Sequence, residues 1–297
     1  MPEIPEIEGL LSFLEPRIVG QRVADIQVAA ISAVKTADPP IFAIRGTEVV
    51  GLQRHGKFLV IDVVDEDGQP LHLATHLSRA GWLRWLDAPS LRPLKLGRGP
   101  LAARLTFVSG DGEISGGFDL TEAGTQKRLA IYLVRDVADV PGIARLGPDP
   151  TDPEFTRESF DAVLDAAGKR HLKTLLRDQS VLAGVGNAYS DEILHAAKLS
   201  PAAAAGSLTD DTRSVLYDAM TEVLTTAVES ARQLPPAELK DGKRSGMRVH
   251  GRGGQPCPVC GDTIRSVSTA DTDWQYCPTC QTGGTPLADR RLSRLLK

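Results

Sequence analysis

The four cysteines of this 297-residue chain lie within one C-terminal stretch, as two Cys-X-X-Cys pairs. Cys257 and Cys260 form the first pair, Cys277 and Cys280 the second, and sixteen residues separate them. Two such pairs at this spacing can place four thiolates around a tetrahedral zinc ion. Disulfides and redox thiols are the alternatives, but intracellular chains rarely keep disulfides, and a redox pair normally occurs singly beside a βαβ unit. We therefore expect one structural zinc ion whose four protein ligands leave no position for catalysis.

A glycine-rich turn precedes a helical pattern earlier in the chain, at Gly184-Val-Gly186-Asn187. The backbone amides of such a turn, the Asn side chain and the helix N-terminus can together face a phosphate. Taken alone, this pattern is more often only a helix cap. Combined with a zinc finger about sixty residues later, it favours a two-part grip on a nucleic-acid backbone.

The charge distribution supports the same interpretation. The whole chain has a formal net charge of −4, which by itself argues mildly against a nucleic-acid partner. Residues 240–297, however, carry ten Lys and Arg against five Asp and Glu, while the remainder carries 24 against 33. A basic section on an acidic protein is a candidate phosphate-binding face.

The N-terminus, MPEIPEIEGLLSFLEP, predicts an amphipathic helix, because apolar residues from Ile4 to Leu14 recur at spacings of three and four. Pro5, Glu6 and Glu8 suit a first helical turn. Pro2 and Glu3 precede the apolar stripe, so packing does not require them. We find no secretory signal and no membrane-spanning run, and expect an intracellular, cytoplasmic protein.

The chain divides into strand-like, connecting and helical regions, which predicts an α+β protein of two domains. Apolar runs over residues 21 to about 135 indicate a mostly antiparallel β-sandwich introduced by the N-terminal helix. The expected boundaries are residues 2–137 for this domain, 138–153 for a linker, 154–236 for a helical domain and 237–297 for a C-terminal segment with the finger at about 248–282.

Five motifs occur in an order that resembles one family. They are Pro2 to Glu8, His55-Gly-Lys57-Phe58, Leu146-Gly-Pro-Asp-Pro150, Asp178 to Glu192 with its Gly-Val-Gly-Asn turn, and the finger ending Cys277-Pro-Thr-Cys280-Gln281. Across nearly its whole length the chain resembles the formamidopyrimidine-DNA glycosylase/endonuclease VIII family of base-excision enzymes. The resemblance implies a helix-two-turn-helix region around Asn187 and a DNA glycosylase with AP-lyase activity.

The resemblance also gives Pro2 and Glu3 a role. With Met1 removed, Pro2 would present a secondary α-amine, whose pKa near 8 leaves a useful neutral fraction at pH 7. Attack on C1′ of a damaged nucleotide would release the base and leave an iminium that favours β-elimination. Glu3 is similar to the family's general acid/base and Lys57 to its lysine at the lesion's sugar–phosphate. The alternative for Pro2 and Glu3 is a frayed terminus without a catalytic role. The alternative for Lys57 is a solvated lysine of a hairpin turn.

DNA contacts implied by the resemblance are expected at six positions: Arg79, Lys127, Arg128, Lys173, Asn187 and Arg265. Some of them depart from the family pattern. Arg79 stands where a methionine commonly fills the emptied base stack, although a surface arginine is an equal alternative. Lys127-Arg128-Leu129 replaces Arg-Arg-Phe, so Leu129 is expected to fill space there. Thr272 stands where an arginine reaches the lesion phosphate, which makes the second, δ-elimination doubtful, with Arg265 as a candidate substitute.

The expected partner is damaged double-stranded DNA, bound by a monomer without membrane contact. A non-catalytic protein that recognises abasic or distorted duplex is the alternative from another functional class. A mature N-terminus at Pro2 and a borohydride-trapped iminium would separate the two. The sequence does not identify the excised lesion.

Overall fold

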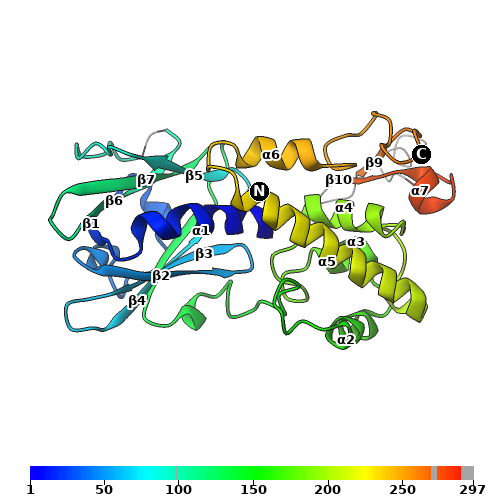
Figure 1. Ribbon diagram of the computed structural model, residues 1–297, viewed down its shortest axis with the longest axis horizontal. Coiled ribbons are helices and arrows are strands. Elements are labelled where there is room, and N and C mark those ends of the chain that lie inside the picture. The colour runs from blue at the N-terminus through cyan, green and yellow to red at the C-terminus, as the bar shows by residue number, and fades with distance from the viewer. Residues whose placement is uncertain (98, 269–272, 289–297) are drawn as a thin grey trace. The chain divides into compact units, whose positions relative to one another are not determined.

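The computed structural model describes residues 1–97, 99–268 and 273–288. They form two compact units (Figure 1). Unit 1 comprises Met1–Arg145 and Ser230–Lys240, and unit 2 comprises Leu146–Glu229 and Asp241–Lys297. Among the described helices, none combines the length and apolarity that a bilayer span requires.

Unit 1 begins with α1 (Ile4–Ile18), as the apolar periodicity predicts. Ile4, Ile7, Leu10, Leu14 and Ile18 are all 0% exposed, so one face of the helix is fully buried. The helix contacts β2 of the sheet that follows (Figure 1).

The strands of unit 1 form one antiparallel sheet of eight strands within the described chain, in the order β5-β7-β6-β1-β2-β3-β4-β8. Their bounds are β1 (Arg22–Val28), β2 (Glu48–His55), β3 (Phe58–Val64), β4 (Pro70–His76), β5 (Gly81–Leu86), β6 (Leu101–Val108), β7 (Ile114–Glu122) and β8 (Ala130–Val134). Short 3-10 helices lie between them: η1 (Ile31–Ala33), η2 (Ile41–Ile44) and, after β8, η3 (Val137–Asp139).

The sheet curls so that its two halves enclose one core, which confirms the expected antiparallel β domain. One apolar cluster joins Leu105 of β6 and Phe118 of β7 to Leu73 of β4 and Leu133 of β8. Where the curl closes, Lys35 N donates to the carbonyl oxygen of Ile131 at 2.9 Å. The sandwich is therefore built from a single hydrogen-bonded sheet.

Residues 230–240 return to unit 1 and pack on α1, a return that no sequence pattern indicated. At Gly9, a Cβ atom would lie 2.7 Å from both the Ala231 carbonyl oxygen and Leu239 Cδ2, so only glycine permits this approach. Trp82 Nε1 also donates to the Pro236 carbonyl oxygen at 3.0 Å. Ala231 and Leu239 thereby join the core of the β domain.

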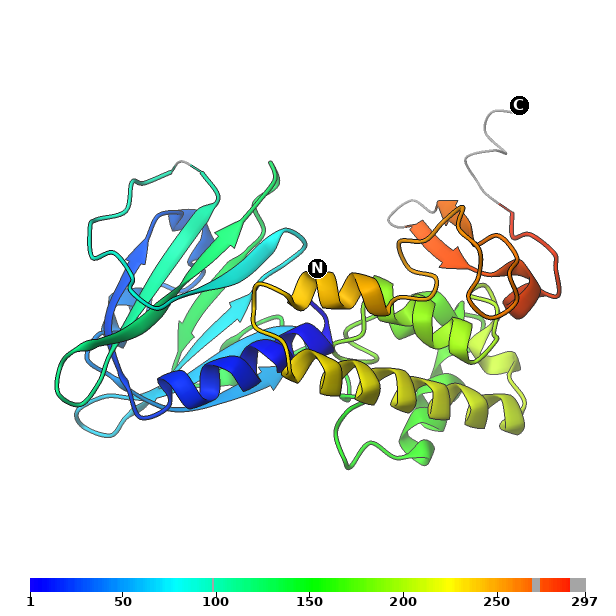
Figure 2. The same ribbon diagram turned by 45° about the horizontal axis from the view of Figure 1, so that its top comes forward.

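Unit 2 is helical and ends in a small zinc-finger-like hairpin. Its elements are α2 (Arg157–Ala167), α3 (Leu172–Leu176), α4 (Asn187–Ala196), η4 (Ala205–Ser207), α5 (Asp210–Arg232), α6 (Leu239–Gly246), β9 (Arg265–Ser268), β10 (Asp273–Tyr276) and α7 (Pro278–Thr282). The end of α5 and the start of α6 belong to unit 1. Within unit 2, β10 and α7 lie against α4 (Figure 2).

Candidate functional site

Pro2 and Glu3 are buried immediately before the first turn of α1. Glu3 is 2% exposed and is the N-cap residue. Its side chain and that of Glu6 form a capping box, in which Glu3 N donates to Glu6 Oε2 at 2.8 Å. This arrangement satisfies amides that the helix itself leaves unpaired, and it fixes the backbone next to Pro2.

Lys57 lies in the tight turn between β2 and β3, and it is only 6% exposed. The turn is connected to α1 through Arg54, whose Nε donates to Glu8 Oε1 at 2.7 Å and whose NH1 donates to the Gly56 carbonyl oxygen at 3.3 Å. Arg232 donates to the other oxygen of Glu8 at 2.7 Å. Burial would raise the pKa of Glu8, but the bonds from Arg232 and Arg54 hold it below its ordinary value. The Lys57 turn and the Pro2–Glu3 segment are thus anchored to the same helix.

His76, at the end of β4, is a neighbour of Lys57 whose individual role the sequence did not suggest. It pairs in register with Phe58, and the two ring centroids are 4.8 Å apart. Burial, and then the positive charge of Lys57, lower the pKa of His76 to about 4. His76 is therefore neutral at pH 7. The only sequence signal was its place beside Leu77 and Arg79.

The other cations expected on unit 1 are exposed, on two connections of the sheet. Arg79 lies in the turn between β4 and β5, and Lys127 and Arg128 lie between β7 and β8. Lys127 Nζ donates to the Glu122 carbonyl oxygen, and the backbone amide of Arg128 donates to Glu122 Oε1 at 2.7 Å. Their exposure is compatible with the predicted DNA contacts.

Leu129 does not fill the space expected of it. It is 2% exposed and packs in the main core of unit 1. Its amide donates to Glu122 Oε1 at 3.0 Å, so the chain already turns into β8 at this residue. The expectation that Leu129 enters the base stack is wrong for this conformation.

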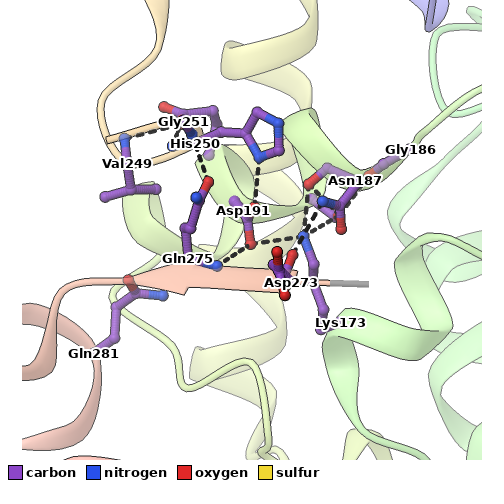
Figure 3. Close-up of polar contacts among 12 residues, drawn as sticks. Lys173, Gly186, Asn187, Asp191, Val249, His250, Gly251, Asp273, Gln275 and Gln281 are labelled. Atoms are coloured by element: carbon purple, nitrogen blue, oxygen red, sulfur yellow. Dashed lines mark hydrogen bonds and ion pairs between the residues drawn. The ribbon is translucent and has the colours of Figure 1, made fainter. Parts of the chain in front are cut away.

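In unit 2, Asn187 is the first residue of α4, as the Gly-Val-Gly-Asn pattern predicted. Gln179 holds the preceding turn, because its Nε2 donates to the Val185 carbonyl oxygen at 2.7 Å and its Oε1 accepts from Gly184 N at 3.0 Å. Asn187 Nδ2 donates to the Asp273 carbonyl oxygen at 3.1 Å (Figure 3). Its Oδ1 is buried and finds no partner among the described residues. The structure thus brings Asn187 to the hairpin of the zinc finger.

Lys173 is a structural residue, which corrects the expectation of a DNA contact. Its side chain is 0% exposed. Nζ donates to the Asn187 carbonyl oxygen at 2.6 Å, to Ser190 Oγ at 2.8 Å and to Asp191 Oδ1 at 2.6 Å (Figure 3). A cation enclosed in this way cannot reach a phosphate. Its charge is instead balanced by Asp191, which also accepts from Gln275 N at 3.1 Å.

Glu192, the neighbour of Asp191, holds the segment that leads into the finger. Its carboxylate accepts three backbone N–H groups, from Arg248 at 2.8 Å, Val249 at 3.0 Å and His250 at 2.8 Å. The His250 ring also lies 2.8 Å from Asp191 Oδ2 (Figure 3). The acidic pair on α4 therefore fixes the basic segment before the first cysteine.

Arg265 begins β9 and is exposed. It pairs with Tyr276, next to the second cysteine pair, whereas Ser268 and Asp273 pair at the opposite end of the hairpin. Over three residues of strand, that places Arg265 about 10 Å from the hairpin turn. Thr272 itself lies outside the described residues. The role of Arg265 remains a prediction.

The four cysteines converge as the spacing predicted. Their sulfur atoms all lie within 4.8 Å of one another. A tetrahedron with Zn–S bonds of about 2.3 Å has edges of about 3.8 Å. The Cys257–Cys280 and Cys260–Cys277 sulfur pairs, at 3.9 and 3.3 Å, lie close to that edge length. The donor set fits one structural zinc ion.

Comparison with known proteins agrees with this geometry. The model of the formamidopyrimidine-DNA glycosylase N-terminal domain matches residues 1–114, the H2TH domain model of the same enzymes matches 146–234, and the zinc finger found in FPG and IleRS matches 254–283. The formamidopyrimidine-DNA glycosylase of Symbiobacterium thermophilum is 32% identical over 305 residues, which cover 98% of this chain and 93% of the relative. The chain belongs to the formamidopyrimidine-DNA glycosylase family.

Two further similarities extend the comparison. An uncharacterised formamidopyrimidine-DNA glycosylase-like protein of Mycobacterium tuberculosis is 53% identical over 161 residues, which cover 54% of this chain and all of that protein. The crystal structure of the Lactococcus lactis enzyme, bound non-covalently to DNA containing an AP site, has a TM-score of 0.77 and 26% identity, and covers 94% of this chain and 99% of its own. Family membership establishes a DNA glycosylase of base excision repair, with DNA as its partner and one structural zinc ion.

Proposed function

We propose that Pro2, with Met1 removed, is the amine that attacks C1′ of the damaged nucleotide. The nitrogen–carbon bond forms as the glycosidic bond breaks and the base leaves. The nitrogen then gives up its proton, and the C1′–O4′ bond of the sugar ring opens as O4′ takes up a proton. Because the proline nitrogen then has no proton left to lose, the adduct stays a cationic iminium. That charge acidifies the C2′ proton, and its removal breaks the C3′–oxygen bond of the 3′ phosphate. Addition of water to C1′ of the remaining iminium breaks the nitrogen–carbon bond and frees the Pro2 amine.

The observation that carries this proposal is the buried Glu3 carboxyl next to Pro2. Burying a carboxyl group is costly, and capping alone does not demand one, because a neutral oxygen acceptor caps a helix equally well. We assign Glu3 the proton transfers that accompany sugar-ring opening and base release. Lys57, held through Gly56 and Arg54 to α1, supplies a positive charge for the lesion's sugar–phosphate.

The substrate in this proposal is damaged double-stranded DNA, bound by a single chain. Arg79, Lys127 and Arg128 would contact it from unit 1, and Asn187 and Arg265 from unit 2. The complex of the Lactococcus lactis enzyme with DNA containing an AP site supports this choice of partner. Because Thr272 is neutral and its neighbours Asp271 and Asp273 are acidic, we propose that strand cleavage stops mainly after β-elimination.

Three variants test the assignment of Pro2 and Glu3 against a duplex containing a single abasic site. Pro2→Gly and Glu3→Gln should keep duplex affinity and slow strand cleavage by at least 100-fold, since a glycine imine can lose the proton and charge that a proline iminium keeps, and Gln cannot transfer a proton. Gln retains the capping oxygen, so the fold should not change. Glu15→Gln, the same substitution at an exposed position of α1, is the matched control and should cleave at the wild-type rate. Pro2→Gly cleavage at the wild-type rate would show that the proline nitrogen and its permanent iminium charge are not required. The same denaturing gel separates β- from δ-elimination ends.

A further inference from the structure

His195 lies near the C-terminal end of α4, where its ring contacts a zinc ligand. The side chain is 2% exposed, and Nε2 lies 3.3 Å from the sulfur of Cys257. Cys257 is itself 3% exposed. The contact joins residues 62 positions apart in the sequence, and it connects the helical part of unit 2 to the first cysteine pair.

The chemistry of the contact fixes the proton on the ring. A zinc-bound cysteine is a thiolate, which can accept a hydrogen bond but has no proton to donate. Nε2 must therefore carry the proton and donate to sulfur. Nδ1 is buried and has no partner among the described residues.

A hydrogen-bond donor to the Cys257 sulfur offsets the cost of burying its negative charge. Four thiolates around one Zn²⁺ leave a net charge of −2, and a buried thiolate without donors is costly. Among the described residues, the Val259 amide also donates to the Cys257 sulfur, at 3.5 Å. The imidazole N–H is the shorter of the two contacts. Groups that hydrogen-bond to metal ligands orient them and commonly alter metal affinity 10- to 100-fold.

The contact also completes a series along one side of α4. Asn187, Asp191 and His195 are spaced four residues apart, so they lie on one face of the helix. They bind, in order, the Asp273 carbonyl, the Gln275 amide and the Cys257 sulfur. One helix thereby holds the start of β10, its middle and a metal ligand.

We propose that His195 is a positioning residue of the zinc site: its Nε2–H donates to the Cys257 thiolate, slows loss of the metal and fixes the finger to α4. The proposal is independent of the roles assigned to Pro2 and Glu3.

Zinc release from the holoprotein into a chromogenic chelator tests the proposal. His195→Phe keeps a ring but removes the donor, and it should release zinc about 10-fold faster or more. His195→Gln places an amide N–H near the position of Nε2, and it should release zinc at a rate close to that of wild type. His171→Phe is the control, because His171 is an exposed histidine of the same unit whose ring contacts Trp274. It should release zinc at the wild-type rate.

Two results of this experiment would overturn the proposal. Wild-type release from His195→Phe would show that the contact does not hold the metal. Equally accelerated release from Phe and Gln variants would show that ring packing acts rather than the hydrogen bond.

A measurement on the unaltered holoprotein covers the case in which a variant does not fold. In ¹⁵N-histidine spectra, His195 should show a protonated Nε2 at pH 7. An unprotonated Nε2 in the wild-type spectrum would contradict the proposal.

Discussion

At the scale of single residues, several charged groups stay inside the protein because each has a specific partner. Lys173 has three acceptors, and Glu192 has three backbone donors. Sequence alone did not separate such residues from ligand-binding ones, because a lysine next to a DNA-binding motif resembles a phosphate contact. Burial distinguishes them. The four cysteines could be assigned to zinc from their spacing, because neither disulfides nor redox thiols suit two Cys-X-X-Cys pairs in a chain that the sequence predicts to be intracellular.

Lys173→Met tests the structural role of the buried ion pair. The variant leaves the Asp191 carboxylate, 1% exposed, without its ammonium partner. We expect a loss of about 3–5 kcal/mol in the free energy of unfolding of unit 2, the usual cost of removing one member of a buried pair. Lys169→Met, at an exposed lysine nearby, should change it by less than about 0.5 kcal/mol. Urea denaturation measures both, and wild-type stability in Lys173→Met would show that the buried ion pair does not stabilise unit 2.

His76 should make unit 1 sensitive to acid. Its folded-state pKa of about 4 lies below the ordinary value of 6.5, so the unfolded chain binds the proton first as pH falls. The contribution of neutral His76 to the free energy of unfolding is complete above pH 6.5. It is lost as pH falls through the interval from 6.5 to 4. At pH 5 the loss should be about 1–2 kcal/mol, after allowance for partial exposure of the ring.

The free energy of unfolding of wild type and of His76→Gln, measured at pH 7 and pH 5, tests this pH-dependent loss of stability. Fluorescence of Trp82 and Trp85 reports on unit 1. The variant should lose about 1–2 kcal/mol less than wild type between the two pH values. An equal loss in both proteins would show that His76 does not contribute.

At the scale of elements, the sequence predicted the parts with strong periodicity. The apolar stripe predicted α1, and alternation predicted the hairpin of β2 and β3. The strand-like runs of the sequence did not include β7, whose two adjacent glycines, Gly116 and Gly117, weaken a strand pattern. In the structure a Cβ at Gly116 would lie 2.4 Å from the Trp85 ring, so glycine is what lets this strand pass the tryptophan. The helix α6 was missed for a similar reason, since its glycines and charged residues carry no apolar period.

At the scale of the whole molecule, the chain contains two compact units, to which we assign different tasks. Unit 1 holds Pro2 and Glu3, and unit 2 holds Asn187 and the zinc finger. The finger has little apolar core of its own. Its buried cluster contains two of the zinc ligands, Cys257 and Cys277, together with Val249 and Ile264.

Removal of zinc should therefore weaken DNA binding and leave the fold of unit 1 unchanged. Chelation, or Cys277→Ser, should release about one zinc ion per chain and weaken binding to an abasic-site duplex by at least 10-fold, because the hairpin needs its metal to fold. The sheet of unit 1 should keep its unfolding midpoint. Fluorescence anisotropy measures the binding, and unchanged affinity after complete zinc loss would exclude the finger from the DNA interface.

The central claim is that Pro2 carries the covalent chemistry, and borohydride reduction during turnover tests it most directly. Wild-type protein incubated with abasic-site duplex and borohydride should become irreversibly joined to the DNA, because reduction fixes the iminium as a stable amine. Mass spectrometry of the digested adduct should place the sugar remnant on the N-terminal peptide, at a Pro2 nitrogen freed of Met1. An adduct on a lysine, or no adduct from protein that binds the duplex, would contradict this account.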